Sequence, residues 1–344
     1  PNFFLPDQRD VVINLADKAQ GGPLFVLLFP TQKDPGALAE FQAMVAAAPG
    51  MLEDGSHLFG ICADPVPLVQ KLAGTENPGF FVLSDADKKV ATRFGARGKL
   101  LGFVFGPDQR VRSVLHPGDT SIAQRAAAEI SAMETPHAFP VPYHPPVLVI
   151  PDVFSPDFCR WMIEQFETRG NEPSGTLRMS EGKMVHVTDG ETKRRRDHHV
   201  VDKDLLDAIG SRMERRVLPE IQRAYHSQIR FVEEFKIVRY DADIGGFFRP
   251  HRDNTAMGTA HRRFAMTLNL NTEDHEGGEL RFPEYGHASY RPATGEAAIF
   301  SCNLLHEATD VTKGSRYVLL SFMYDQSGQD LMERVRKAEA QRNG

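Results

Sequence analysis

Short apolar runs alternate with amphipathic stretches over the first 134 residues. The run LFVLLF at 24–29 is continuously apolar, which is typical of a strand buried on both faces. The stretch that follows, 36–47, carries Leu38, Phe41 and Met44 at helical spacing, which predicts a helix. The same patterns predict further strands at 58–62 and 80–83, helices at 66–72, 88–94 and 121–133, and a hairpin of strands 102–105 and 111–115. We therefore expect an α/β domain, a mixed sheet with helices on both faces, over residues 1–134.

Prolines separate this region from the rest of the chain. Residues 135–146 read TPHAFPVPYHPP, a density of proline that disfavours both helix and sheet and favours extended chain. We interpret 135–146 as a linker between two domains, the second of which covers residues 147–344.

The second domain combines helical and strand patterns. An apolar run at 147–150 predicts a strand, and Ser155 followed by Pro156 is a favourable helix start. Apolar residues at helical spacing over 205–221 predict another helix, which Pro219 should kink or split. Strands are predicted at 231–240, 297–302 and 317–324, and a frayed helix over 330–344. We expect the helices to support the outside of a barrel.

Candidate metal ligands lie among these strands. His251 and Asp253 are two residues apart, so in an extended segment their side chains point to the same side. His306 follows the predicted strand 297–302 and could reach the pair from an opposing strand. Two histidines and one carboxylate form the facial triad of Fe(II) oxygenases, which leaves coordination positions open. Arg316, ten residues further on, offers a planar cation suited to a carboxylate.

The order of these residues resembles the 2-oxoglutarate- and Fe(II)-dependent dioxygenases, within them the prolyl 4-hydroxylase-like branch. The matching positions are Tyr240, His251, Asp253, Gly277-Gly278-Glu279, Pro292, Gly295, His306 and Gly314-Ser315-Arg316. The resemblance implies a double-stranded β-helix, or jelly roll, that uses Fe(II), 2-oxoglutarate as co-substrate and O2. It also implies that Arg316 binds the distal carboxylate of 2-oxoglutarate and that Tyr240 helps to hold it.

The N-terminal region resembles the peroxiredoxins and the wider thioredoxin fold. The resemblance rests on the element order and on Phe29-Pro30, Asp34-Pro35 and Glu40-Phe41. Ala37 and its neighbours stand where that family places its peroxide-attacking cysteine, and the chain has no C-x-x-C. Because peroxidase chemistry needs a thiolate, we expect the fold without the activity. We interpret Cys62, inside an apolar strand, as a small core residue rather than a displaced redox centre.

The polar segment 169–200 allows two interpretations. It is either a solvated surface loop or a lid that contacts substrate. The adjacent histidines His198 and His199 within it suggest a second metal site, but neighbouring residues point apart, so we disfavour it.

Charge and cysteine content narrow the class of protein. The formal net charge of -6 argues against nucleic-acid or anionic-membrane partners. Three scattered cysteines give no disulfide framework and favour a cytoplasmic protein. No signal peptide or transmembrane span is evident. Both resemblances are compatible with a homodimer.

Three functions remain open from the sequence. The first is a dioxygenase that hydroxylates an unactivated C–H bond of a small molecule or amino acid, releasing succinate and CO2. The second is a hydroxylase of a peptidyl residue, with the N-terminal domain docking the partner. The third is a non-catalytic thioredoxin-fold binding protein with a vestigial barrel. The intact set of His251, Asp253, His306 and Arg316 argues against this third function. Desaturation or ring closure would use the same iron site.

Overall fold

The computed structural model describes residues 3–19, 21–74, 79–133, 143–180, 183–187 and 190–343. The chain forms two compact units, Pro1–Phe139 and Pro140–Gly344, each described separately below. The division between them falls within the predicted linker 135–146. Most of that linker, 135–142, lies outside the described residues.

The N-terminal unit is built on a five-stranded sheet in the order β5-β4-β3-β6-β7. Its strands are β3 (Leu24–Phe29), β4 (His57–Cys62), β5 (Phe81–Ser84), β6 (Leu101–Phe105) and β7 (Val111–Leu115). Strands β3, β4 and β5 run parallel, whereas β6 and β7 form the predicted antiparallel hairpin. Every residue of β3 is buried, as its apolar run predicts for a central strand.

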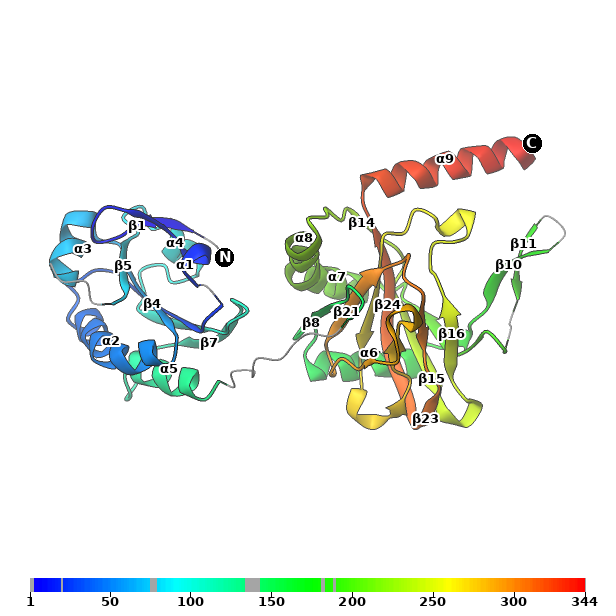
Figure 1. Ribbon diagram of the computed structural model, residues 1–344, viewed down its shortest axis with the longest axis horizontal. Coiled ribbons are helices and arrows are strands. Elements are labelled where there is room, and N and C mark those ends of the chain that lie inside the picture. Colours follow the sequence, from blue (N-terminus) through cyan, green and yellow to red (C-terminus); the bar gives the residue numbers. More distant parts are fainter. Residues whose placement is uncertain are drawn as a thin grey trace. The chain divides into compact units, whose positions relative to one another are not determined.

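Helices cover this sheet on both faces, which confirms the predicted α/β layering. Figure 1 shows α2 (Pro35–Glu53) and α5 (Ile122–Ser131) side by side. The other elements are α1 (Leu15–Ala19), α3 (Val66–Ala73), α4 (Lys89–Arg93) and a hairpin of β1 (Phe4–Pro6) and β2 (Val12–Asn14). The predicted end of α2 at residue 47 is wrong. Ala48 and Met51 continue its buried face, so the helix extends past Pro49.

The C-terminal unit is formed by two facing sheets, consistent with the predicted jelly roll. The larger sheet has the order β8-β21-β17-β24-β15-β13-β9, with β14 paired to β24, and the smaller has the order β12-β16-β22-β19-β20. The larger sheet contains β8 (Leu148–Ile150), β9 (Glu172–Pro173), β13 (Arg196–His199), β14 (Phe231–Val232), β15 (Lys236–Asp241), β17 (Phe264–Asn269), β21 (Ala297–Ser301) and β24 (Ser315–Tyr324). The smaller sheet contains β12 (Lys193–Arg194), β16 (Phe247–His251), β19 (Leu280–Arg281), β20 (Ser289–Tyr290) and β22 (His306–Ala308). Two further pairs are β10 (Thr176–Ser180) with β11 (Lys183–Val187), and β18 (Glu276–Gly277) with β23 (Val311–Lys313).

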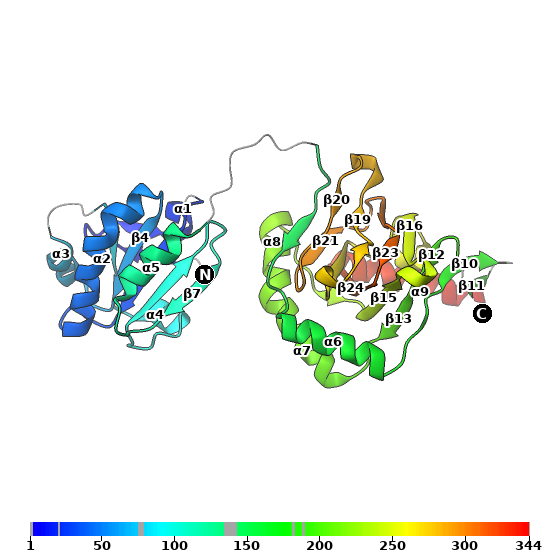
Figure 2. The ribbon, with the colours of Figure 1, turned by 90° about the horizontal axis from the view of Figure 1, so that it is seen from below.

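Helices pack on the outer face of the larger sheet, as Figure 2 shows for α6 (Pro156–Thr168), α7 (Lys203–Arg212) and α8 (Leu218–Tyr225). Ser155 caps α6 by accepting a hydrogen bond from the backbone N–H of Phe158. The predicted split near Pro219 is confirmed, because a π-helical turn at Met213–Val217 separates α7 from α8. The last helix, α9, covers Gln326–Asn343.

Two predicted elements of this unit are wrong. The single strand predicted at 231–240 is two, β14 and β15, separated by residues 233–235, where the Glu233 carboxylate binds Arg262 and His261. The segment 169–200 is not a loop in its described parts, since it contains β9 to β13. Four of its polar side chains, Ser174, Lys193, Asp197 and His198, are buried. None of the helices in the described part of the chain is long and apolar enough to span a membrane.

Candidate active site

His251, Asp253 and His306 meet at one point of the barrel. His251 ends β16 and pairs in register with His306, which begins β22. Their Nε2 atoms lie 3.4 Å and 3.3 Å from the two carboxylate oxygens of Asp253. One ligand atom from each residue falls within 4.8 Å of the others. The structure thus brings together the three residues predicted as metal ligands, from one strand end, the following turn and the neighbouring strand.

Backbone contacts orient both imidazoles toward Asp253. The Nδ1 atom of His251 lies 2.8 Å from the carbonyl oxygen of Arg249, and that of His306 lies 2.9 Å from the carbonyl oxygen of Leu304. Because a carbonyl oxygen only accepts, each Nδ1 carries the proton and each Nε2 presents a lone pair. This arrangement is the outer-shell support that metal-binding histidines usually have.

Burial and mutual charge set the protonation of this group. Burial lowers the pKa of His306, which favours the neutral imidazole. Burial opposes the charge of Asp253, but His306 and His251 outweigh it and lower the pKa of that carboxyl. Phe248 stacks on His251, with ring centroids 3.5 Å apart, and Phe300 packs against His306 at 4.6 Å.

The donor set fits Fe(II). Two neutral nitrogen donors and one carboxylate, on side chains that are 19%, 8% and 10% exposed, match the facial arrangement that leaves further positions for small ligands. It contains no thiolate, which argues against a structural zinc site of the cysteine-rich kind.

Arg316 lies deep in the same barrel. It belongs to β24, pairs in register with Tyr240 on β15, and is only 4% exposed. Its Nη2 atom lies 3.2 Å from Oδ1 of Asn269 and 3.5 Å from Oγ1 of Thr267, and its guanidinium lies 5.4 Å from the centre of the Tyr240 ring. No carboxylate among the described residues forms an ion pair with it.

A buried arginine without an acidic partner is costly. Burial lowers the pKa of Arg316 from its usual value, and Arg195 and Arg291 act in the same direction. Gly278, at a φ of +69°, approaches it so closely that a Cβ would lie 2.7 Å from Cδ of Arg316. The site is therefore shaped tightly around a cation that lacks its anion.

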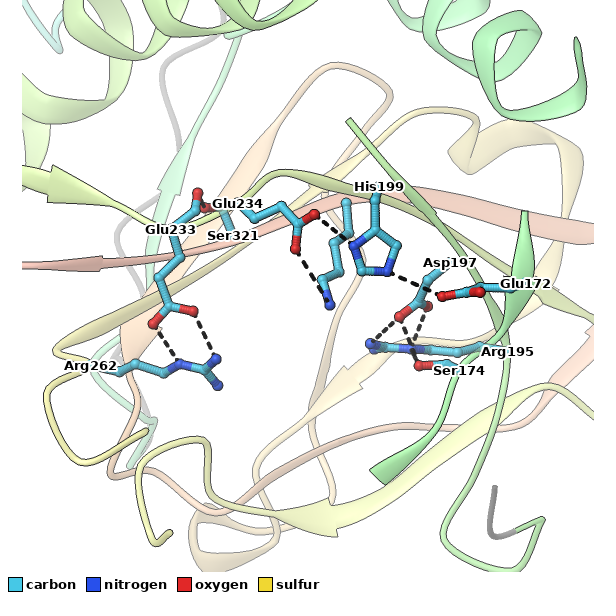
Figure 3. A network of polar contacts seen from close by, with 10 residues as sticks. Glu172, Ser174, Arg195, Asp197, His199, Glu233, Glu234, Arg262 and Ser321 are labelled. Carbon is cyan, nitrogen blue, oxygen red and sulfur yellow. Dashed lines mark hydrogen bonds and ion pairs between the residues drawn. The ribbon is translucent and has the colours of Figure 1, made fainter. Parts of the chain in front are cut away.

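Tyr240 connects Arg316 to a second arginine. The Tyr240 hydroxyl lies 3.1 Å from Nη1 of Arg195, and Nε of Arg195 lies 3.0 Å from Oδ1 of Asp197. Ser174 donates a hydrogen bond of 2.7 Å to Oδ2 of Asp197. Figure 3 shows Ser174, Arg195 and Asp197 converging in this way. Arg195 is thus neutralised and holds the Tyr240 hydroxyl in place.

Comparison with known proteins agrees with these geometries. The family model described as the 2OG-Fe(II) oxygenase superfamily matches residues 235–324, which include the whole His251, Asp253, His306 and Arg316 set. The model of the AhpC/TSA family matches residues 1–117. A putative peroxiredoxin of Mycobacterium tuberculosis is 30% identical over 123 residues, 33% of this chain and 80% of that protein. The chain belongs to the AhpC/TSA family in its N-terminal unit, and its C-terminal unit contains a 2OG-Fe(II) oxygenase domain.

Both family assignments confirm the resemblances seen in the sequence. The rat procollagen lysine hydroxylase and glycosyltransferase LH3 is 34% identical over 103 residues, 29% of this chain, which spans only 13% of the length of LH3. A solved Pseudomonas putida prolyl-4-hydroxylase is 16% identical, with 52% of this chain and 92% of that one covered and a TM-score of 0.42.

The AhpC/TSA unit lacks the groups for thiol chemistry among its described residues. Ala37 lies in the first turn of α2, 1% exposed, with its N–H bound to the Asp34 carboxylate at 2.9 Å. Cys62 ends β4 and is 1% exposed, and burial raises the pKa of its thiol to about 12. A thiol of this kind is not ionised at neutral pH, which agrees with the interpretation of Cys62 as a core residue.

The oxygenase unit holds residues that the sequence interpretation missed. Lys193 and Arg195 were taken as part of a loop or lid, but they lie on and beside β12, close to Phe248 and Tyr240. No alternation signalled this arrangement, because every residue from 193 to 199 is charged or histidine. His198 and His199 point apart, to Gly170 and Glu234, and neither joins a metal-binding cluster among the described residues.

Proposed function

We propose that the protein is an Fe(II)- and 2-oxoglutarate-dependent dioxygenase that hydroxylates an unactivated C–H bond of a small molecule or amino acid. The proposal rests on the observation that one barrel contains two buried features. These are the His251, Asp253 and His306 cluster, and Arg316, a cation without an acidic partner. The first matches the donor set for Fe(II), and the second matches the far end of a dicarboxylate.

Each residue has a definable part in this chemistry. His251, Asp253 and His306 would hold the metal, and the carbonyl oxygens of Arg249 and Leu304 keep both Nε2 atoms free of protons. When bound, the iron supplies the activation of O2 that is coupled to conversion of 2-oxoglutarate to succinate and CO2.

The surrounding side chains position the co-substrate. Arg316 would neutralise the distal carboxylate of 2-oxoglutarate, and Tyr240 lies close enough to support it. Phe248 and Phe300 cover the imidazoles and limit access of water to them.

A peptidyl substrate is the second candidate function. It is favoured by the names of the relatives, which include a procollagen lysine hydroxylase and a prolyl-4-hydroxylase. In that case the AhpC/TSA unit would dock the partner protein. Neither candidate involves nucleic acid, and either could act as a homodimer.

Turnover of 2-oxoglutarate decides between these functions. Full-length protein with Fe(II), O2 and ascorbate should form succinate and CO2 in equal amounts, and the rate should rise with the right substrate. A rise with a small-metabolite library supports the first candidate, and a rise with protein extract alone supports the second. Absence of succinate under all of these conditions, with Fe(II) bound, would contradict the dioxygenase assignment.

A further inference from the structure

A cavity of about 130 Å³ opens on the inner side of β13 and β15, beside the candidate iron site. Figure 3 shows several of its lining residues. The complete lining is Glu172, Pro173, Ser174, Gly175, Lys193, Arg195, Asp197, His199 and Lys236. Since a water molecule takes about 30 Å³ of liquid volume, the cavity has room for a carboxylate-sized group.

Most charges of this cavity are already paired. Arg195 is bound to Asp197 at 3.0 Å. His199 lies 2.6 Å from Glu234, which is also 4.0 Å from the ammonium of Lys236. A ligand that displaced these partners would have to break existing contacts.

Lys193 is the exception. The residue is 7% exposed, and its ammonium forms no hydrogen bond or ion pair with any residue that the structure describes. Its polar contact is with the Phe248 ring, whose centre lies 5.3 Å from Nζ. Burial, and then Arg195, lowers the pKa of Lys193 to about 7, which is the response expected of a buried cation without an anion.

The cavity adjoins the reacting centre. Lys193 pairs in register with Phe248 across β12 and β16, and the same Phe248 ring stacks on His251 at 3.5 Å. A group bound at Lys193 is therefore separated from a candidate iron ligand by a single aromatic ring. Arg316 does not line this cavity, so the two cations Lys193 and Arg316 serve different places in the barrel.

We propose that the primary substrate is a small carboxylic acid, whose carboxylate pairs with the ammonium of Lys193 inside this cavity. One unpaired cation matches the single charge of a carboxylate better than the charge of about -2 on a phosphate. The cavity lining also includes Glu172, 71% exposed, which would accept an ammonium group. A free amino acid carries both groups, a carboxylate that would pair with Lys193 and an ammonium that would pair with an acidic side chain. This inference rests on the proposed dioxygenase function and specifies its substrate.

The test compares acids with their amides. Full-length protein loaded anaerobically with Fe(II) and saturating 2-oxoglutarate is titrated with the twenty protein L-amino acids and with their primary amides, using thermal shift and calorimetry. Saturating co-substrate keeps the probes away from Arg316. We expect at least one free acid to bind, and its amide, which lacks the negative charge, to bind at least tenfold more weakly. Equal binding of acid and amide, tighter binding of inorganic phosphate, or binding of no acid would overturn the proposal.

Lys193→Met tests the assigned partner. We expect this variant to lose roughly 10- to 100-fold in affinity for the acid, because a charge-assisted hydrogen bond is removed. Lys313→Met is the matched control, since Lys313 is 74% exposed and pairs with Glu276 on the surface. An unchanged acid affinity in Lys193→Met, or a weakened affinity for 2-oxoglutarate alone, would overturn the assignment. The acid–amide comparison on the unmutated chain stands even if this variant does not fold.

Succinate formation separates this inference from the proposed function. An acid that binds through Lys193 and stimulates succinate formation supports both. Binding through Lys193 without any succinate would leave the carboxylate site standing and contradict the dioxygenase function. Succinate formation stimulated by amides as strongly as by acids would support the dioxygenase function and contradict the carboxylate site at Lys193.

Discussion

The two units of this chain have kept their family folds but differ in what they have kept of the family chemistry. In the AhpC/TSA unit, the turn that enters α2 is intact, yet Ala37 stands where a nucleophile is needed and the thiol of Cys62 is buried. In the oxygenase unit, the candidate metal ligands and the buried cation are all present. Ala37 is itself part of the core that packs on β3, so this position contributes to the scaffold without offering a nucleophile.

The largest effect is expected at the metal ligands, where a substitution tests whether the oxygenase unit has kept its chemistry. His306→Ala should abolish Fe(II) binding and reduce succinate formation to background, because it removes one of three protein ligands. Anaerobic Fe(II) titration and a succinate assay measure the two effects, and circular dichroism checks that the fold persists. A His306→Ala protein with normal turnover would show that the site has been assigned to the wrong residues.

The second-largest effect is expected at Arg316, the cation proposed to bind the co-substrate. Arg316→Leu should raise the Kd for 2-oxoglutarate by roughly 30- to 1000-fold, which corresponds to about 2–4 kcal/mol for a buried carboxylate left without its partner. Fe(II) affinity should stay the same, because Arg316 is not a ligand. Anaerobic titration of 2-oxoglutarate in the presence of Fe(II) measures both. An unchanged Kd would mean that another group holds the co-substrate.

Helix caps allow a matched test in both units. Ser121 caps α5 and Ser155 caps α6, each by accepting a backbone N–H three residues on. Replacing either serine with alanine should lower the free energy of unfolding of its own unit by about 1 kcal/mol. Urea unfolding followed by circular dichroism would report each shift. A loss well above this value at Ser121 would point to its second contact, in which its hydroxyl donates to Glu40.

The smallest effect is expected on the consumption of hydrogen peroxide. The full chain should consume no hydrogen peroxide with a thiol reductant, and Cys62→Ser should change nothing, because the thiol is buried and its pKa is raised to about 12. Peroxide consumption assayed without Fe(II) tests this. Reductant-dependent consumption that disappears in Cys62→Ser would show that the AhpC/TSA unit has retained chemistry in a displaced position.

Local patterns predicted the elements of the N-terminal unit from β3 onward, but not β1, β2 or α1, and they predicted the members of the metal cluster. The spacing of His251 and Asp253 is sufficient because it is set within one extended segment. The surroundings of Arg316 were harder, since its burial depends on Tyr240, Thr267 and Asn269 arriving from other strands.

The segment 169–200 was misinterpreted for a related reason. Polar residues usually indicate solvent, but here Arg195 and Asp197 neutralise each other inside the barrel. Burial of that pair follows from β13 adding to β15, a contact between residues about 40 positions apart. The sequence shows no strand periodicity there, because residues 193–199 are all charged or histidine.

On the proposed function, the unpaired guanidinium of Arg316 would make folding of the barrel depend on the supply of the dicarboxylate that it binds. Any molecule that binds only the folded state stabilises it by mass action, by about 2.7 kcal/mol when its concentration is 100 times its Kd. A domain whose ligand also relieves an uncompensated interior charge should open less often when that ligand is abundant. Because proteases act on opened states, the lifetime of the protein in a cell would then follow the concentration of 2-oxoglutarate.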